Sequence, residues 1–203
     1  NVLRAGLTPK YVDIPELLKI TNFTPIPPPL WAGTPVADAD GTRYRALETV
    51  RQYGAAQLDR ADEADQASVR HLGWCLGAAT ALGTPDGAGH AWRSAFDQLA
   101  DELRAALRWA AARAGRRPEA YRLAIALAEL TFARGLPGES QRRYEQAAGL
   151  AADDALAAAA LRCAAGAARS RHVGDDAFRL QLAAADAAVR AGDPAGAAMD
   201  LAQ

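Results

Sequence analysis

Lysine is almost missing from this 203-residue chain: of its 23 lysines and arginines, only Lys10 and Lys19 are lysines. A phosphate-binding loop of the form Gly-x-x-x-x-Gly-Lys-[Ser/Thr] needs a lysine that reaches the β- and γ-phosphates of a nucleotide. The chain after residue 19 therefore cannot contain such a loop. We expect no nucleotide site and no cofactor in this part of the sequence.

Aromatic residues are also scarce, at 6% of the chain, although half of all residues are hydrophobic when alanine is counted. Alanine is the best helix former, and it buries little apolar area per residue. The composition therefore predicts closely packed helices with small side chains at their contacts, in place of a thick aromatic core.

The residue types that carry catalysis or bind metals do not occur at the spacings such sites need. No Gly-x-Ser-x-Gly elbow is present. His71, His90 and His172 are scattered over helical and loop sequence, whereas a zinc site needs three or four converging ligands. Cys75 and Cys163 lack CxxC spacing, and we expect both to be buried free thiols. We predict no catalytic residue, no metal site and no enzyme activity.

The charge balance and the hydrophobic runs point to a cytoplasmic protein. The net charge is −1 with a pI of about 6.4, so no basic field is present to hold nucleic acid. No run of eighteen apolar residues without charge occurs, and no basic, apolar leader opens the chain. We expect no direct contact with nucleic acid and no membrane segment.

Residues 1–30 differ in composition from the remainder. Both lysines, both asparagines and three of the four isoleucines fall there, whereas the later chain is rich in alanine, arginine and glycine. The prolines of Pro25-Ile-Pro-Pro-Pro29 predict a stiff, extended linker. We interpret 1–30 as a foreign-looking leader with a proline-rich linker, and whether it is native or a chimera stays open.

The letters of residues 1–25, NVLRAGLTPKYVDIPELLKITNFTP, closely resemble a segment of type I mannose-6-phosphate isomerases, the zinc-dependent cupin enzymes. In that family the arginine that matches Arg4 lies in the active site, and the residue that matches Lys10 is close by. The resemblance implies an alternative identity, a fragment or fusion related to an enzyme of zinc-dependent aldose–ketose isomerisation. The family's zinc ligands and β-barrel have no counterpart in this chain, so we expect no isomerase activity.

Residues 42–58, TRYRALETVRQYGAAQL, have the periodicity of an amphipathic helix. The apolar residues recur three apart at Tyr44, Leu47, Val50 and Tyr53, and Leu58 follows four residues after Gly54. Just before it, near 31–44, the pair Asp40-Gly41 predicts the turn of a short β-hairpin.

The chain after residue 60 predicts only helices. One is expected from Asp62-Glu-Ala-Asp65 to Gly83, and another over about 91–114. Helix pairs then follow, with units that start near residues 118, 154 and 194, at spacings of 36 and 40 residues. Because one pair cannot bury its own apolar face, we expect the pairs to stack.

Two stretches, TRYRALETVRQYGAAQL at 42–58 and FDQLADELRAALRWAAARAG within 96–115, resemble large actinobacterial AfsR/SARP- or LuxR-like transcriptional regulators. In those proteins the first stretch closes the winged helix of an NB-ARC-like STAND ATPase, and tetratricopeptide (TPR)-like helical repeats follow. The implied fold class is all-α: antiparallel helix pairs stacked as a TPR-like right-handed solenoid, with a short β-hairpin near 31–44 and an irregular leader. The implied domains after the leader are a winged-helix remnant at 31–61, a helical linker domain at 62–115 and TPR-like repeats at 116–203.

The same resemblance implies a non-catalytic interaction and sensor module. It would bind a protein partner, a small-molecule inducer or the ATPase domain of a parent protein, and couple that binding to the parent's nucleotide switch. The inner helices of the repeats would supply a groove, with Tyr121, Glu129 and Arg162 as candidate binding residues. The residues expected to couple the module to the switch are Arg45, Glu48, Arg51 and Tyr53. Whether the parent's effector domain binds DNA or is a cyclase or kinase stays open.

Overall fold

The computed structural model describes residues 33–38, 41–46, 48–84 and 89–202. The leader expected at 1–30, with Arg4 and Lys10, lies outside them. The chain divides into two compact units, residues 1–73 and 74–203.

The first unit contains two antiparallel strands and the helix that follows them. Strand β1 (Gly33–Asp38) pairs with β2 (Gly41–Ala46), in the stretch where the sequence predicts a hairpin, and Val36 lies opposite Arg43. The next helix, α2, spans Glu48–Arg60. The prediction of a helix from Thr42 is therefore wrong over its first five residues. Their alternation of arginine with other residues suits a strand, and β1 supplies the backbone partners that a strand needs.

Helix α2 buries only some of the apolar residues that the sequence predicts on one side of an amphipathic helix. Leu58 is buried, but Tyr53 is 53% exposed. The prediction that Tyr53 packs inward is therefore wrong, and this helix presents an aromatic ring to solvent.

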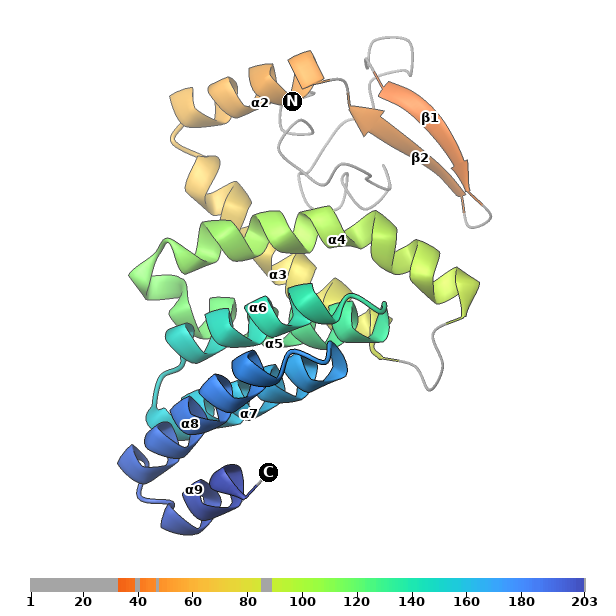
Figure 1. Ribbon diagram of the computed structural model, residues 1–203. Helices are drawn as coiled ribbons and strands as arrows, with labels where there is room; N and C mark the ends of the chain where they lie inside the picture. Colours follow the sequence, from red (N-terminus) through yellow and green to blue (C-terminus); the bar gives the residue numbers. More distant parts are fainter. Residues whose placement is uncertain (1–32, 39–40, 47, 85–88, 203) are drawn as a thin grey trace. The chain divides into compact units, whose positions relative to one another are not determined.

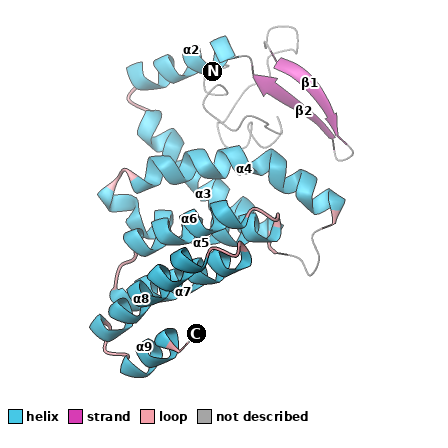
Figure 2. Ribbon diagram, viewed as in Figure 1, coloured by secondary structure: helices cyan, strands magenta, loops and turns pink. Residues whose placement is uncertain are grey.

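From residue 48 onward, all regular structure in the described part of the chain is helical (Figure 2). The all-α class is thus confirmed for this region. The helix that the sequence predicts over about 91–114 ends three residues earlier, at Ala111. After α2, the elements are α3 (Ala64–Leu82), α4 (His90–Ala111), the short 3₁₀ helix η3 (Ala114–Arg116), α5 (Arg117–Ala133), α6 (Pro137–Leu150), α7 (Asp154–Ser170), α8 (Gly174–Arg190) and α9 (Pro194–Leu201).

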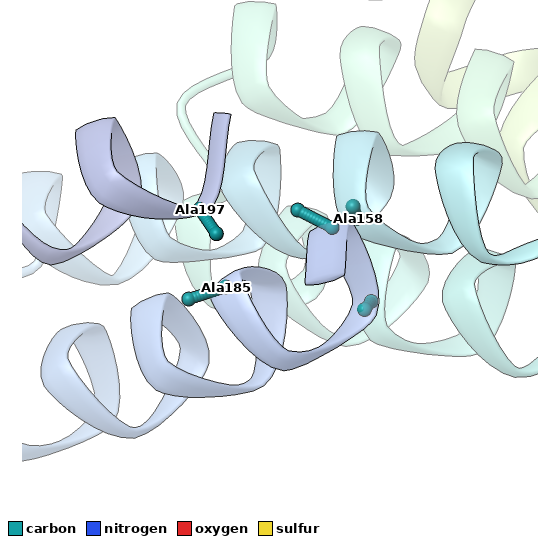
Figure 3. Close-up of a cluster of buried hydrophobic side chains, with 5 residues drawn as sticks. Ala158, Ala185 and Ala197 are labelled. Atoms are coloured by element: carbon teal, nitrogen blue, oxygen red, sulfur yellow. The ribbon is translucent and has the colours of Figure 1, made fainter. Parts of the chain in front are cut away.

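Within the second unit, helices that are neighbours in sequence pack against each other from α4 to α9 (Figure 1). Their contacts consist largely of alanine. Ala158 of α7, Ala185 of α8 and Ala197 of α9 belong to one buried cluster (Figure 3). A second cluster joins α7 to α8 around Leu180. Small side chains let the helix backbones approach closely, as the composition predicts.

The helices α5 to α8 form two pairs in a common register. Helix α5 begins at Arg117 and α7 at Asp154, 37 residues later, and α6 and α8 begin 37 residues apart, at Pro137 and Gly174. Positions 37 residues apart are buried alike: Leu123 and Ala160, Leu127 and Ala164, Leu130 and Ala167, Thr131 and Ala168, Ser140 and Ala177, Ala147 and Ala184. The second pair thus repeats the burial pattern of the first, mostly with smaller residues.

Four of the described connecting turns share one geometry. A residue with positive φ ends the helix before each turn: Asp62 at 56°, Gly135 at 84°, His172 at 59° and Gly192 at 78°. In each turn the next residue's N–H donates to a carbonyl five residues back, for example from Leu136 to Thr131 at 2.8 Å. This pattern is a Schellman motif, which satisfies carbonyls that the helix end leaves free. After α7 it is His172 that adopts the left-handed conformation, and Gly174, two residues later, is the first residue of α8.

We predict that His172→Gly stabilises the protein. A side chain in the left-handed region costs about 1–2 kcal/mol, part of which glycine's greater freedom in the unfolded chain offsets. The expected gain is about 0.5–1 kcal/mol in the free energy of unfolding, measured by urea denaturation. The matched control is Gly135→Ala in the equivalent turn, where a Cβ would meet no atom within 4 Å. It should lose about 1 kcal/mol, and a loss from both substitutions would contradict this account of the turn.

Candidate functional site

Helix α5 holds two of the three predicted groove residues on the side away from its core. Pro118 lies in its first turn, where a missing N–H costs nothing. The core side contains Leu123, Leu127 and Leu130, all buried. Tyr121 and Glu129 lie off that side, half-buried and exposed respectively.

Cys163 of α7 is a common neighbour of these residues. Partial burial raises the pKa of its thiol, the charge of Glu129 raises it further, and Arg162 lowers it. Burial also raises the pKa of Tyr121, with Cys163 among the smaller causes. On α6, burial raises the pKa of Tyr144 well above its ordinary range, with smaller effects from Cys163 and Glu129. The Cys163 thiol therefore lies within electrostatic reach of both phenols and of the Glu129 carboxyl, which three helices supply.

Glu129 differs from Glu119, Glu139 and Glu145 in having no cationic partner among the described residues. Burial is the cause that raises the pKa of its carboxyl, and no hydrogen bond or ion pair to it is found among the described residues. By contrast, Glu139 binds Arg104 and Glu145 binds Arg179. A carboxylate without a partner, in an exposed position within electrostatic reach of Tyr144, can accept a cationic group from a ligand.

The third groove candidate, Arg162, has an intramolecular partner. Its Nε donates to Oδ1 of Asp200 at 2.6 Å, and this bond is the main reason that the pKa of Arg162 is raised. Asp200 is 3% exposed. Arg162 therefore connects α7 to α9, while its charge still acts on Cys163.

Two residues of the cluster were not singled out from the sequence. Tyr144 was not considered, and Cys163 was expected to be buried but is exposed. The prediction for Cys75 is confirmed, since it is buried and its thiol donates to the carbonyl of Glu102 at 3.7 Å. One feature of the sequence could have drawn attention to Cys163: it is a single polarisable residue in an alanine-rich helix. It directly precedes Ala164, which is buried.

The four predicted coupling residues belong to the first unit and do not share one helix. Arg45 lies in β2, opposite Thr34, while Glu48, Arg51 and Tyr53 lie in α2. The expectation that all four lie on a helix over 42–58 is therefore wrong for Arg45. Tyr53 is exposed and available for contact.

No metal centre is found in the described ranges, because no three His, Cys, Asp or Glu side chains there are grouped to hold an ion. Among the helices that the structure describes, none is long and apolar enough to cross a membrane.

Comparison with known proteins yields one short match. No family model matches the chain, and no solved structure matches it. A stretch of 27 residues is 70% identical to mannose-6-phosphate isomerase of Salmonella typhimurium. It covers 13% of this chain and 7% of that enzyme. That family is the one that residues 1–25 resemble, and a match of this length says nothing about the helical unit.

We predict that Glu129→Gln stabilises the protein at neutral pH. Folding raises the pKa of Glu129, so the ionised carboxylate destabilises the folded protein. This loss of stability develops as pH rises through the folded-state pKa. It is absent below the pKa of the unfolded chain. Solvent screens this exposed group, so the gain in urea denaturation at pH 7 should be roughly 0.2–1 kcal/mol and vanish near pH 4.

The matched control is Glu119→Gln on the same helix. A backbone N–H and then Arg116 lower the pKa of Glu119, so its carboxylate contributes stability above its unfolded pKa and loses it as pH falls. This substitution should therefore be destabilising at pH 7. If both substitutions changed the free energy of unfolding in the same direction at pH 7, burial would not be the cause of the raised pKa of Glu129.

Proposed function

We propose that this chain is a non-catalytic protein-interaction and sensor module of a STAND-type ATPase transcriptional regulator. The repeated helix pair, with its common 37-residue spacing from α5 to α7, is the main support. Stacked helix pairs form extended surfaces for partners, and a TPR-like right-handed solenoid is the arrangement that we propose for this unit. The resemblance of 42–58 and 96–115 to AfsR/SARP- or LuxR-like regulators agrees with this function.

The proposed binding site is the cluster of Tyr121, Glu129, Tyr144 and Cys163. Glu129 supplies a carboxylate without an internal cation, and Tyr144, which lies within its electrostatic reach, supplies apolar ring surface. Such a site suits a lysine or arginine whose methylene groups lie on a ring while its charged end reaches the carboxylate. We therefore propose a protein partner with an exposed basic side chain as the ligand, in preference to a small-molecule inducer.

Binding at this site would act on a switch that lies in the parent protein's ATPase domain. A ligand shifts such an equilibrium only by as much as its affinity differs between the two states. We propose that α2, with Glu48, Arg51 and the exposed Tyr53, contacts the ATPase domain and transmits this shift in the equilibrium to it. The 27-residue isomerase match covers 7% of that enzyme and is too short to support a second function.

An array of short synthetic peptides tests the proposed ligand. Matched sets would carry Lys, Arg, Gln or Glu at one central position, and the purified full chain would be applied to them. We expect several-fold stronger retention on the Lys and Arg members, because charge-assisted bonds are roughly twice as strong as neutral ones. Glu129→Gln should remove this preference.

Glu119→Gln is the control, since it changes a glutamate on the same helix that already binds Arg116. It should leave the preference for basic peptides intact. No preference in the unaltered chain, or an equal loss in both variants, would contradict a binding site at Glu129.

A further inference from the structure

Phe132 extends the surface around Glu129 along helix α5. The two residues are three apart on this helix, a spacing that places their Cβ atoms about 5–6 Å apart on one side. Glu129 is exposed, and Phe132 is 47% exposed. The core side of the helix lies elsewhere, since Leu127 and Leu130 are buried. A carboxylate and an aromatic ring therefore lie next to each other at the surface.

The stacking of helix pairs leaves this side of α5 uncovered. The following pair, α7 and α8, is in place, and both side chains are still exposed. The equivalent positions 37 residues later are Gly166 and Arg169 of α7, and Arg169 is exposed as well. Among the described residues, the only side chain within 4 Å of a Cβ added at Gly166 would be that of Arg169, at 3.9 Å. A further pair of the same array would therefore not cover Glu129 and Phe132.

The charge of this surface indicates what can cover it. Two nearby arginines are already bound: Arg134 donates to both carboxylate oxygens of Asp97 at 2.9 Å, and Arg162 donates to Asp200 at 2.6 Å. The charge of Glu129 is therefore left for a ligand. A purely apolar ligand would remove water from this carboxylate without replacing it by a cation, which is costly. A purely basic ligand would leave the Phe132 ring in water.

We propose that this surface binds an extended segment of a partner protein in which one residue separates a lysine or arginine from a large apolar residue. Alternate side chains of an extended segment point to the same side, about 6.5–7 Å apart, which is close to the spacing of Glu129 and Phe132. The basic residue binds Glu129, and the apolar residue packs on the ring of Phe132. This inference rests on the proposed function and adds the sequence that the partner must present.

Three labelled synthetic peptides test the proposal by fluorescence anisotropy with the full chain. Their central residues are Leu-Ser-Lys-Ser-Leu, Ser-Leu-Lys-Leu-Ser and Leu-Ser-Gln-Ser-Leu, within identical Gly-Ser flanks. The first two have the same composition, and each reads alike in both chain directions. Only the first places leucine on the same side as lysine. We expect it to bind roughly fivefold more tightly than the second, because a leucine then covers the exposed part of the Phe132 ring.

Substitutions in the chain assign each preference to its residue. Phe132→Ala should make the two lysine peptides bind equally and keep the preference for lysine over glutamine. Glu129→Gln should remove the preference for lysine over glutamine. The matched control is Phe178→Ala, the same change at a 65% exposed ring of α8, which should keep both preferences. Circular dichroism would check that each variant keeps its helix content.

The failure of this inference differs from the failure of the proposed function. Equal binding of the two lysine peptides to the unaltered chain, with lysine still preferred over glutamine, would overturn the inference alone. No preference for lysine over glutamine would overturn both. Equal effects of Phe132→Ala and Phe178→Ala would place the apolar contact elsewhere. A concentration-dependent dimer in sedimentation equilibrium that Phe132→Ala abolishes would assign this surface to a second copy of the chain and overturn the inference.

Discussion

Alanine at helix contacts imposes a constraint on the second unit. A buried alanine contributes little apolar area, so many such contacts must accumulate before they offset the entropy lost on folding. Close approach of α7, α8 and α9 brings Ala158, Ala185 and Ala197 into one cluster (Figure 3). Stability therefore depends on each helix pair being covered by the next one.

The polar contacts between pairs follow the same register. Arg104 and Glu139 are joined by two short bonds, and the guanidinium holds the pKa of Glu139 below its ordinary range. The bond from Gln141 to Asp176 occupies the equivalent place one pair later. The cluster around Glu129 lies outside this system of contacts, so the proposed interaction there uses side chains that the stacking leaves available.

Local signals in the sequence predicted much of the helical unit. Gly135 and Pro137, like Gly192 and Pro194, mark a helix end and the next helix start, and the structure agrees to within about a residue. Capping chemistry is local, so it can be read from neighbouring residues. The first residues of the 42–58 helix were mispredicted because a strand depends on a partner elsewhere in the chain.

The candidate site was less predictable for the same reason. Arg162 meets Asp200 38 residues later, and no pattern within α7 indicates that contact. The exposure of Cys163 and its proximity to Tyr144 likewise follow from how three helices pack. His172 has a positive φ at a position where Gly135 and Gly192 stand in equivalent turns. Histidine as a residue type does not predict that conformation.

Within the second unit, one helix pair repeats after 37 residues, from α5 and α6 to α7 and α8. Inserting a second copy of residues 117–153 between Asp153 and Asp154 tests this repeat. We expect a monomer with proportionally more helix by circular dichroism and one cooperative unfolding transition, because the new pair offers the same contacts on both sides. A control insertion of residues 117–135 alone should disrupt packing. Loss of helix or of cooperativity with the full 37-residue insertion, to the same extent as with the control, would contradict the repeat.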